Sequence, residues 1–434
     1  MDKMADVLGR AGAWCGQNKY LSAIKNAFQN FMPLTIAGAI GVLWCNVLVN
    51  ETTGLGMFFK PIMALDFLNP AFQAVNFCTI SCITVGITLG IAQEIGIWNM
   101  GAEKAGYIPG LVGLAAWLSV TNTSHMVDGA KEAFTGVAGN ELGATGLFTG
   151  MIIGVLSVEL FCFFEKQDAL KIKMPEQVPP GVARAFEVLV PATITLIITA
   201  CIGSACYNLT GLYLNDVIKN GIQGPLGAVG ATIPGVMIIY LVIMLFWLVG
   251  IHGNNMLSAV KEALFTPLAL ENVEAFNKGE TPKNIINMYA LQMWGEFGGS
   301  GVTIGLVIAI MIFGKREDNK AIATLSLVPG LFNINETVTF GIPMVLNPIL
   351  GIPFVFACLV TIIVGYVLTV IGFCPVACLT VPWTTPPIVF GFLACGANVM
   401  GAVTQAILIV VSTVIYTPFL IAYEKYQNKQ AAEA

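Results

Sequence analysis

A polar tip between two apolar stretches carries residue types that could bind and deprotonate a hydroxyl. It reads Asn333-Ile-Asn335-Glu336. A carboxylate at the centre of a membrane helix costs about 2.5–3.5 kcal/mol on insertion scales, so such a residue needs a partner or a function. The functional interpretation is a glutamate that faces a wet cavity and accepts hydrogen bonds from sugar hydroxyls, with the two amides beside it. The alternative is a loop-tip glutamate that caps a short helix.

A histidine stands at the end of another apolar stretch, in Gly250-Ile-His252-Gly-Asn254-Asn255. Its imidazole could donate a hydrogen bond to a ligand or act as a base. A histidine at a helix end can also be satisfied by the backbone alone, but the adjoining asparagines favour a binding role. His125, in a polar loop, has no such neighbours, and we interpret it as structural or solvent-exposed.

Aromatic and acidic residues accompany these two segments. Trp247 precedes His252 by five residues, and Trp383 stands in a proline-rich stretch. An indole face suits the apolar C–H face of a pyranose ring, although tryptophans also populate both membrane interfaces. Glu296, in Trp294-Gly-Glu296-Phe-Gly-Gly, is a weaker binding candidate.

The composition requires these residues to be positioned by a membrane domain. Of 434 residues, 56% are apolar and only 10% are charged, whereas soluble chains carry roughly a quarter charged residues. The net charge of −5 and the lack of a basic, aromatic-rich cluster exclude a nucleic-acid partner. The cysteines form no ligand-spaced group with histidine, so no metal and no cofactor are predicted.

The predicted fold class is all-α integral membrane, with about ten transmembrane helices that cross a hydrocarbon core roughly 30 Å thick. We expect one membrane domain with an N-terminal half (31–232), a C-terminal half (233–423) and a short tail (424–434). Glu94 and Glu159, within or near apolar stretches, are expected to join polar contacts between helices. The candidate spans are 31–49, 73–93, 107–121, 145–164, 188–208, 233–251, 301–314, 352–373, 383–400 and 402–422.

Three further segments do not read as spans. Residues 1–30 predict an amphipathic interfacial helix, with an ordinary solvated helix as the alternative. Segments 254–300 and 321–350 mix short apolar arms with polar residues, and each arm is too short to cross. We predict two re-entrant helical hairpins, because irregular backbone at membrane depth is tolerated where it lines a cavity.

Positive charges predict the orientation of the chain. Lysines and arginines cluster after the fourth and seventh candidate spans and at the C-terminus, and the N-terminal segment is also basic. Positively charged loops face the cytoplasm. Both termini are therefore predicted to be cytoplasmic, in a multi-pass protein of a bacterial cytoplasmic membrane.

Several motifs together resemble the enzyme IIC subunit of the sugar phosphotransferase system, in its lactose/cellobiose/diacetylchitobiose branch. The resemblance extends over nearly the whole chain and is carried by Gly250–Asn255, Phe332–Glu336, Phe340-Gly-Ile-Pro343 and Asn347-Pro348. One departure is Thr337, which follows the glutamate where the family usually has proline. The resemblance implies a homodimer with most of its contact in the N-terminal half. It also implies a sugar site enclosed by the C-terminal half and both hairpins.

The family resemblance also implies a reaction. A IIC protein binds an external disaccharide, such as cellobiose, diacetylchitobiose or lactose, and presents a hydroxyl to a phosphocysteine on a cytosolic IIB protein. No IIB domain is visible in the sequence, so the phosphoryl donor is expected to be another chain. Glu336 and His252 are then the catalytic candidates, and the chain takes part in phosphotransfer only together with IIB. The implied substrate-binding residues are Trp247, His252, Asn254, Asn255, Glu296, Asn333, Asn335, Glu336 and Trp383.

The alternative function is a proton-coupled secondary sugar transporter. Intramembrane carboxylates often serve proton relays, and Glu336 would be the coupling site. A channel is disfavoured, because the polar groups gather in two discontinuous segments instead of forming rings along a pore.

Overall fold

The computed structural model is mostly helical, as predicted, and is described for residues 10, 13–14, 17–51, 55–125, 133–175, 177–225, 230–342 and 344–433. Much of the predicted interfacial helix at 1–30 and Pro343 of one family motif lie outside these residues. Helices dominate because the backbone of a membrane domain must satisfy its own hydrogen bonds.

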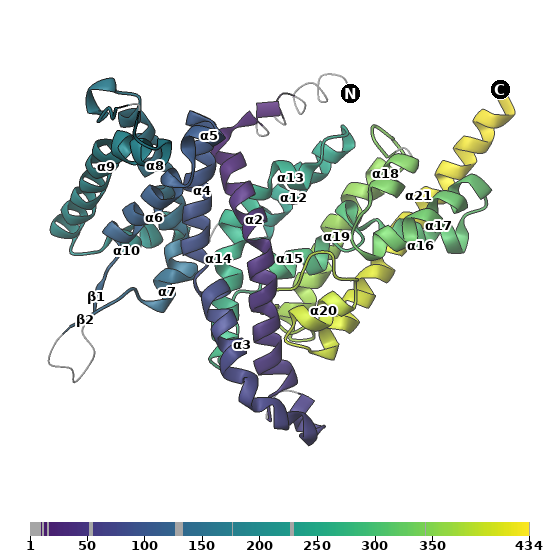
Figure 1. The fold of residues 1–434 in the computed structure, drawn as a ribbon. Coiled ribbons are helices and arrows are strands. Elements are labelled where there is room, and N and C mark those ends of the chain that lie inside the picture. Colours follow the sequence, from purple (N-terminus) through teal and green to yellow (C-terminus); the bar gives the residue numbers. More distant parts are fainter. Residues whose placement is uncertain are drawn as a thin grey trace. The chain divides into compact units, whose positions relative to one another are not determined.

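The chain divides into two compact units (Figure 1). The N-terminal unit comprises Gln17–Gly38 and Ala74–Gly227. The C-terminal unit comprises Met1–Gly16, Ala39–Gln73 and Ala228–Ala434. The division near residue 228 lies close to the predicted boundary at 233, but the assignment of 39–73 to the C-terminal unit was not predicted.

The helix α2 (Lys19–Leu43) runs without a break through residue 30. No helix end therefore separates the described part of the predicted interfacial segment from the first candidate span. Whether residues 19–30 lie at the membrane interface stays a prediction.

The N-terminal unit is built on four helices, α4, α6, α8 and α9, that pack against one another (Figure 1). Small residues permit the close approach: a Cβ on Gly150 would lie 2.9 Å from Cγ2 of Thr84. The elements of this unit are η4 (Phe77–Ser81), α4 (Ile83–Met100), α5 (Ala102–Ala105), α6 (Ile108–Val120), β1 (Ser124–His125), β2 (Phe134–Thr135), α7 (Gly139–Leu142), α8 (Ala144–Glu165), η5 (Asp168–Leu170), α9 (Pro180–Thr210), α10 (Leu214–Ile218) and η6 (Lys219–Gln223). The two short strands pair antiparallel.

Two acidic residues of this unit join helices, as the sequence predicted. The Asn26 amide donates to Glu94 Oε2 at 2.9 Å. The Lys19 ammonium lies 2.6 Å from Glu159 Oε1. These contacts bind α2 to α4 and α8, and confirm the structural interpretation of both glutamates.

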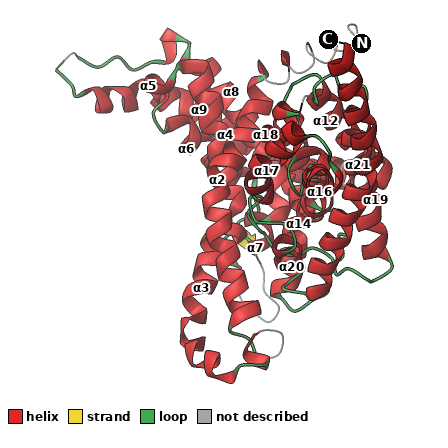
Figure 2. Cartoon of the chain, turned by 90° about the vertical axis from the view of Figure 1, so that its right-hand side faces the viewer, coloured by secondary structure: helices red, strands yellow, loops and turns green. Residues whose placement is uncertain are grey.

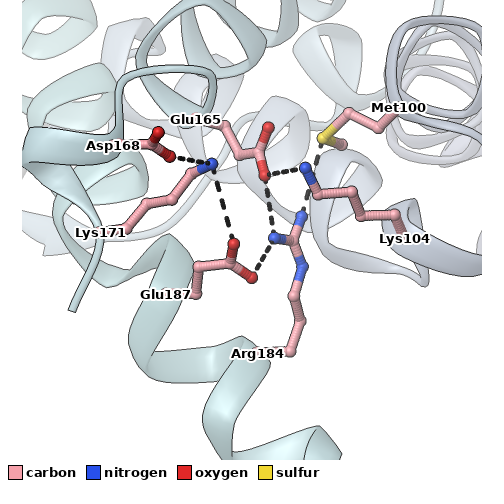
Figure 3. Close-up of polar contacts among 7 residues, drawn as sticks. All are labelled: Met100, Lys104, Glu165, Asp168, Lys171, Arg184 and Glu187. Carbon is pink, nitrogen blue, oxygen red and sulfur yellow. Dashed lines mark hydrogen bonds and ion pairs between the residues drawn. The ribbon is translucent and has the colours of Figure 1, made fainter. Parts of the chain in front are cut away.

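A charged cluster holds the connection between α8 and α9 (Figure 3). The Glu165 side chain is 1% exposed and pairs with Lys104 at 2.8 Å and Arg184 at 3.0 Å. Arg184 also binds Glu187 at 2.7 Å, and Lys171 lies 3.9 Å from that second glutamate. A buried carboxylate is tolerated only when it is paired and hydrogen-bonded, which these two cations achieve. Lys171 and Arg184 belong to the basic cluster that predicts a cytoplasmic loop after the fourth candidate span. These contacts show that both residues also hold that loop in place.

The C-terminal unit is built on α16, α19 and α21 (Figure 2). The helices α12 and α15 pack against α19, and α20 packs against α21. Its elements are η1 (Trp44–Leu48), η2 (Leu55–Met57), η3 (Lys60–Leu68), α12 (Ile233–Leu248), α13 (Gly253–Met256), α14 (Ser258–Asn277), α15 (Met288–Gly295), η7 (Ser300–Val302), α16 (Ile304–Phe313), α17 (Glu317–Leu331), α18 (Glu336–Gly341), α19 (Gly351–Val370), α20 (Val389–Ala394) and α21 (Val399–Glu433). The helix α3 (Asn69–Asn76) runs from this unit into the other.

The predicted count of about ten spans is not confirmed. Among the described residues, five helices are long and apolar enough to cross a membrane, and two bent helix pairs raise the number to seven. The helices α6 and α12 are shorter and apolar. The candidate span 383–400 contains only the six-residue helix α20 and the first two residues of α21. Prolines at 382, 386 and 387 explain this, since proline removes a backbone donor and disfavours a helical residue before it.

Each predicted hairpin segment contains two main helices, and the first segment also includes the end of α13 and the start of η7. The first contains α14 and α15, separated by the non-helical stretch 278–287. The second contains α17 and α18, separated at 332–335. Whether these two segments are re-entrant stays a prediction.

Candidate functional site

His252 and Glu336, 84 positions apart in the sequence, face each other in the C-terminal unit. His252 Nε2 lies 3.9 Å from Glu336 Oε1, and the side chains are 39% and 46% exposed. His252 precedes α13, and Glu336 opens α18. The two residues expected to do chemistry are therefore brought together, with both side chains accessible.

A contact with the backbone determines which ring nitrogen of His252 carries the hydrogen. The Asn255 N–H donates to His252 Nδ1 at 3.3 Å, while also approaching the His252 carbonyl at 3.1 Å. Since Nδ1 accepts, the neutral imidazole carries its hydrogen on Nε2. A donor thus faces an acceptor across 3.9 Å, which is too long for a direct hydrogen bond. One hydroxyl, about 2.8 Å from each atom, would satisfy both.

Trp247 supports the imidazole. Its ring centroid lies 4.5 Å from that of His252, and the residue is only 2% exposed. The buried indole restricts how the histidine can turn. A direct sugar contact of Trp247 stays a prediction.

Asn333 fixes the tip that carries Glu336. Its backbone is left-handed, with φ of 62°, a conformation that asparagine tolerates better than most residues. Its Oδ1 accepts from the Gly298 N–H at 2.6 Å, while its amide donates to the carbonyls of Trp383 and Thr385, the latter at 3.1 Å. Both amide hydrogens are thereby used by backbone groups.

Asn335 adds a second link to the same neighbouring segment. Its amide donates to the Ser300 carbonyl at 2.9 Å, and the residue is 4% exposed. The segments are so close that a Cβ on Gly299, where φ is 86°, would lie 2.6 Å from Asn335 Cβ. Only glycine fits there. The structure thus uses both asparagines as a clamp between the tips 296–301 and 333–336, and their direct contact with a sugar stays a prediction.

Glu296 lies at the end of α15, on the clamped tip. Its Oε1 accepts from the Tyr240 hydroxyl at 2.6 Å and pairs with the Lys261 ammonium. Among the described residues, the Glu296 side chain binds these two residues and makes no hydrogen bond with His252 or Glu336.

The remaining predicted residues differ in how exposed their side chains are. Trp383 is 44% exposed, so it is the predicted tryptophan with an accessible indole face. Asn255 is exposed, whereas Asn254 is half-buried and its Oδ1 has no hydrogen-bond partner among the described residues.

Sequence reasoning missed three residues that hold this site. Tyr240 and Lys261 bind Glu296, and Gln405 joins separate elements by accepting from Ile388 N at 2.8 Å and donating to the Met293 carbonyl at 3.2 Å. A signal existed for Lys261 and Gln405, because a cation or an amide within apolar sequence needs a partner. Tyr240 gave none.

Comparisons with known proteins show the family of this chain. Residues 25–358 match the family described as phosphotransferase system, EIIC. The chain is 33% identical to the oligo-beta-mannoside-specific EIIC component of Bacillus subtilis (strain 168), over 98% of this chain and 94% of that protein. It is 29% identical to the cellobiose-specific EIIC component of Lactococcus lactis subsp. lactis (strain IL1403), over 98% of each chain.

A solved structure is also similar. The crystal structure of the transporter ChbC, the IIC component from the N,N'-diacetylchitobiose-specific phosphotransferase system, aligns with a TM-score of 0.88 and 30% identity, covering 97% of both chains. The chain belongs to the EIIC family of the phosphotransferase system, and it is a multi-pass membrane component of a sugar permease that works with a IIB partner.

Proposed function

We propose that this EIIC component takes up a disaccharide of the cellobiose or diacetylchitobiose type, and that His252 and Glu336 bind the hydroxyl that receives the phosphoryl group. Cargo names of three relatives support this class, since they specify oligo-beta-mannoside, cellobiose and N,N'-diacetylchitobiose. Lactose is the alternative cargo, supported by the lactose-specific EIICB component of Streptococcus mutans, 28% identical over 96% of this chain.

The observation that carries the proposal is the 3.9 Å separation of His252 Nε2 and Glu336 Oε1. A hydroxyl oxygen can accept from the histidine while its own hydrogen is donated to the carboxylate. Neither a cation nor an apolar ligand uses both groups in this way.

The proposed reaction follows from these roles. The hydroxyl oxygen attacks the phosphorus of the IIB phosphocysteine, and its proton passes to Glu336. The new O–P bond forms as the S–P bond breaks, and the IIB cysteine leaves as a thiolate. Phosphoryl transfer depends mainly on alignment and charge stabilisation, so a fixed hydroxyl and a nearby base are what the acceptor side must supply.

We further propose that segments 254–300 and 321–350 are re-entrant, that both termini are cytoplasmic and that the chain forms a homodimer through its N-terminal half. The turns at 278–287 and 332–335 support the first of these, because each is followed by a helix of only eight (α15) or six (α18) residues, which is too short to cross a membrane. Lys425 and Lys429 at the end of α21 support the second. Light scattering of the purified protein tests the third.

The function is tested in proteoliposomes. Sugar phosphate should accumulate inside only when phosphorylated IIB is supplied on the inner side. Accumulation of unmodified disaccharide driven by a pH gradient, without IIB, would instead favour the proton-coupled alternative and overturn the proposal.

Replacement of His252 by alanine should weaken disaccharide binding at least about tenfold, equivalent to 1.4 kcal/mol, because the variant loses the donor that faces Glu336. Isotherms with labelled cellobiose and diacetylchitobiose measure the change. His125→Ala is the matched control, since that ring contacts the Asn122 carbonyl in the N-terminal unit. Equal affinities of the two variants would remove His252 from the site.

A further inference from the structure

We propose that Lys261 and Tyr240 are positioning residues for Glu296. They hold one carboxylate oxygen so that the other oxygen accepts a second sugar hydroxyl, separate from the one that reacts. This inference rests on the proposed function.

The first support is how one oxygen of Glu296 is occupied. Its Oε1 receives both the Tyr240 hydroxyl, at 2.6 Å, and the Lys261 ammonium. Tyr240 is fully buried and Lys261 is 5% exposed. The ammonium also lies 5.4 Å from the centroid of the tyrosine ring, a cation–π distance. Three polar groups are thus joined inside the protein, and the carboxylate has little freedom to turn.

The second support is the state of the other oxygen. Among the described residues, no donor binds Glu296 Oε2. The atom is not buried either, since it is absent from the buried oxygens that lack a partner. The side chain as a whole is 17% exposed. An accessible acceptor with unused lone pairs is therefore held on a carboxylate that is otherwise fixed.

The third support is the position of Glu296 on elements that also hold the site. Tyr240 and Trp247 lie seven residues apart on α12, about two helical turns, and so share one face. One end of this face binds Glu296, and the other lies against His252. The Glu296 carbonyl accepts from Gly299 N at 3.0 Å, on the same tip that Asn333 and Asn335 fasten beside Glu336.

The charge of Lys261 explains why a second carboxylate is tolerated here. An unpaired carboxylate in an apolar environment is costly, and a nearby cation offsets that cost. The pair is neutral overall, so Glu296 can accept a hydroxyl hydrogen without adding net charge to the site. The cargo that fits is a neutral sugar with at least two hydroxyls toward these groups, and an anionic sugar is disfavoured by the charge of Glu336.

The test is a double-mutant cycle with Lys261→Met, Glu296→Gln and the combined variant. Labelled cellobiose and diacetylchitobiose are the probes, and ligand-free melting temperature is measured in parallel. Replacing both partners of a buried ion pair by neutral groups of similar size removes the charge imbalance that each single change creates. We expect the combined variant to melt near the parent temperature and yet to bind at least about tenfold more weakly.

Non-additivity distinguishes positioning from a purely structural role. If Lys261 acts through Glu296, the combined variant binds no more weakly than Glu296→Gln alone. Parent affinity in the combined variant would overturn the inference, as would losses that simply add. Lys261→Arg, which preserves the charge, should retain more affinity than Lys261→Met.

Tyr240→Phe decides the matter if the combined variant does not fold. It removes one hydrogen bond to Oε1, worth about 0.5–1.5 kcal/mol, and leaves all charges in place, so the melting temperature should fall only slightly. Binding to the folded variant should weaken several-fold, and parent affinity would contradict the inference. Lys278→Met is the matched control, because that lysine pairs with Glu274 on the exposed end of α14.

Failure of the proposed function would look different. If the parent protein binds neither disaccharide, the cargo assignment fails first. If the parent binds and Glu336→Gln weakens binding while the Glu296 series does not, the proposed function stands and this inference alone is overturned.

Discussion

Replacement of Glu336 by glutamine should lower the rate of sugar phosphorylation at least about a hundredfold. Glutamine keeps the size and one acceptor oxygen of glutamate, but it cannot take up the hydroxyl proton. Disaccharide binding should weaken about tenfold as well, because a charge-assisted hydrogen bond becomes a neutral one. Proteoliposomes with phosphorylated IIB measure the rate of sugar phosphate formation, and isotherms measure the affinity.

Glu317→Gln is the matched control for this change. Glu317 begins α17, the helix that leads into the predicted hairpin 321–350, but its side chain is 87% exposed and, among the described residues, pairs with Lys320 alone at 3.2 Å. Exposed pairs of this kind contribute about 0–1 kcal/mol, so this variant should transport at the parent rate. A Glu336→Gln variant that phosphorylated sugar as fast as Glu317→Gln would exclude Glu336 as the base.

The long apolar helices were predictable from sequence because their physical cause is local. The windows 145–164 and 352–373 correspond to α8 (Ala144–Glu165) and α19 (Gly351–Val370). In a membrane each span must bury its backbone polar groups within itself, so composition over about 20 residues is sufficient information.

The misread elements depend on backbone chemistry or on distant contacts. The window 383–400 is apolar enough to suggest a span, yet its prolines leave only α20 and the first two residues of α21 helical. Segment 39–73 groups with the C-terminal unit, although it precedes most of the N-terminal unit in the sequence. Tertiary packing decides that assignment, and it cannot be predicted from the local sequence.

The same distinction applies to the site. His252 and Glu336 were predictable because each is a polar group within apolar sequence, where its cost demands an explanation. The partnership of Glu296 with Tyr240 and Lys261 was not predictable, since it joins residues 56 and 35 positions apart. Sequence also cannot tell whether an asparagine binds a ligand or satisfies irregular backbone, because both uses require the same amide.

Asn333→Ala is the change that tests the clamp most directly, and it should both destabilise the protein and weaken binding. Alanine removes the acceptor of Gly298 N and the donors to the carbonyls of Trp383 and Thr385. It must also adopt a φ of 62°, which alanine disfavours. With each lost hydrogen bond worth about 0.5–1.5 kcal/mol, a total cost of about 3 kcal/mol is expected. Thermal unfolding in detergent measures it.

Binding then reports whether the clamp serves the site. Glu336 follows Asn333 by three residues, and among the described residues its own backbone makes no hydrogen bond to the tip 296–301. Losing the Asn333 contacts should therefore let the carboxylate move away from His252. Disaccharide binding should weaken at temperatures where the variant is still folded. Asn208→Ala is the matched control, because that exposed amide donates to the Ser204 hydroxyl at a long 3.5 Å within α9. A folded Asn333→Ala variant with parent affinity would show that the position of Glu336 is set by α18 itself, and that the asparagine contributes stability alone.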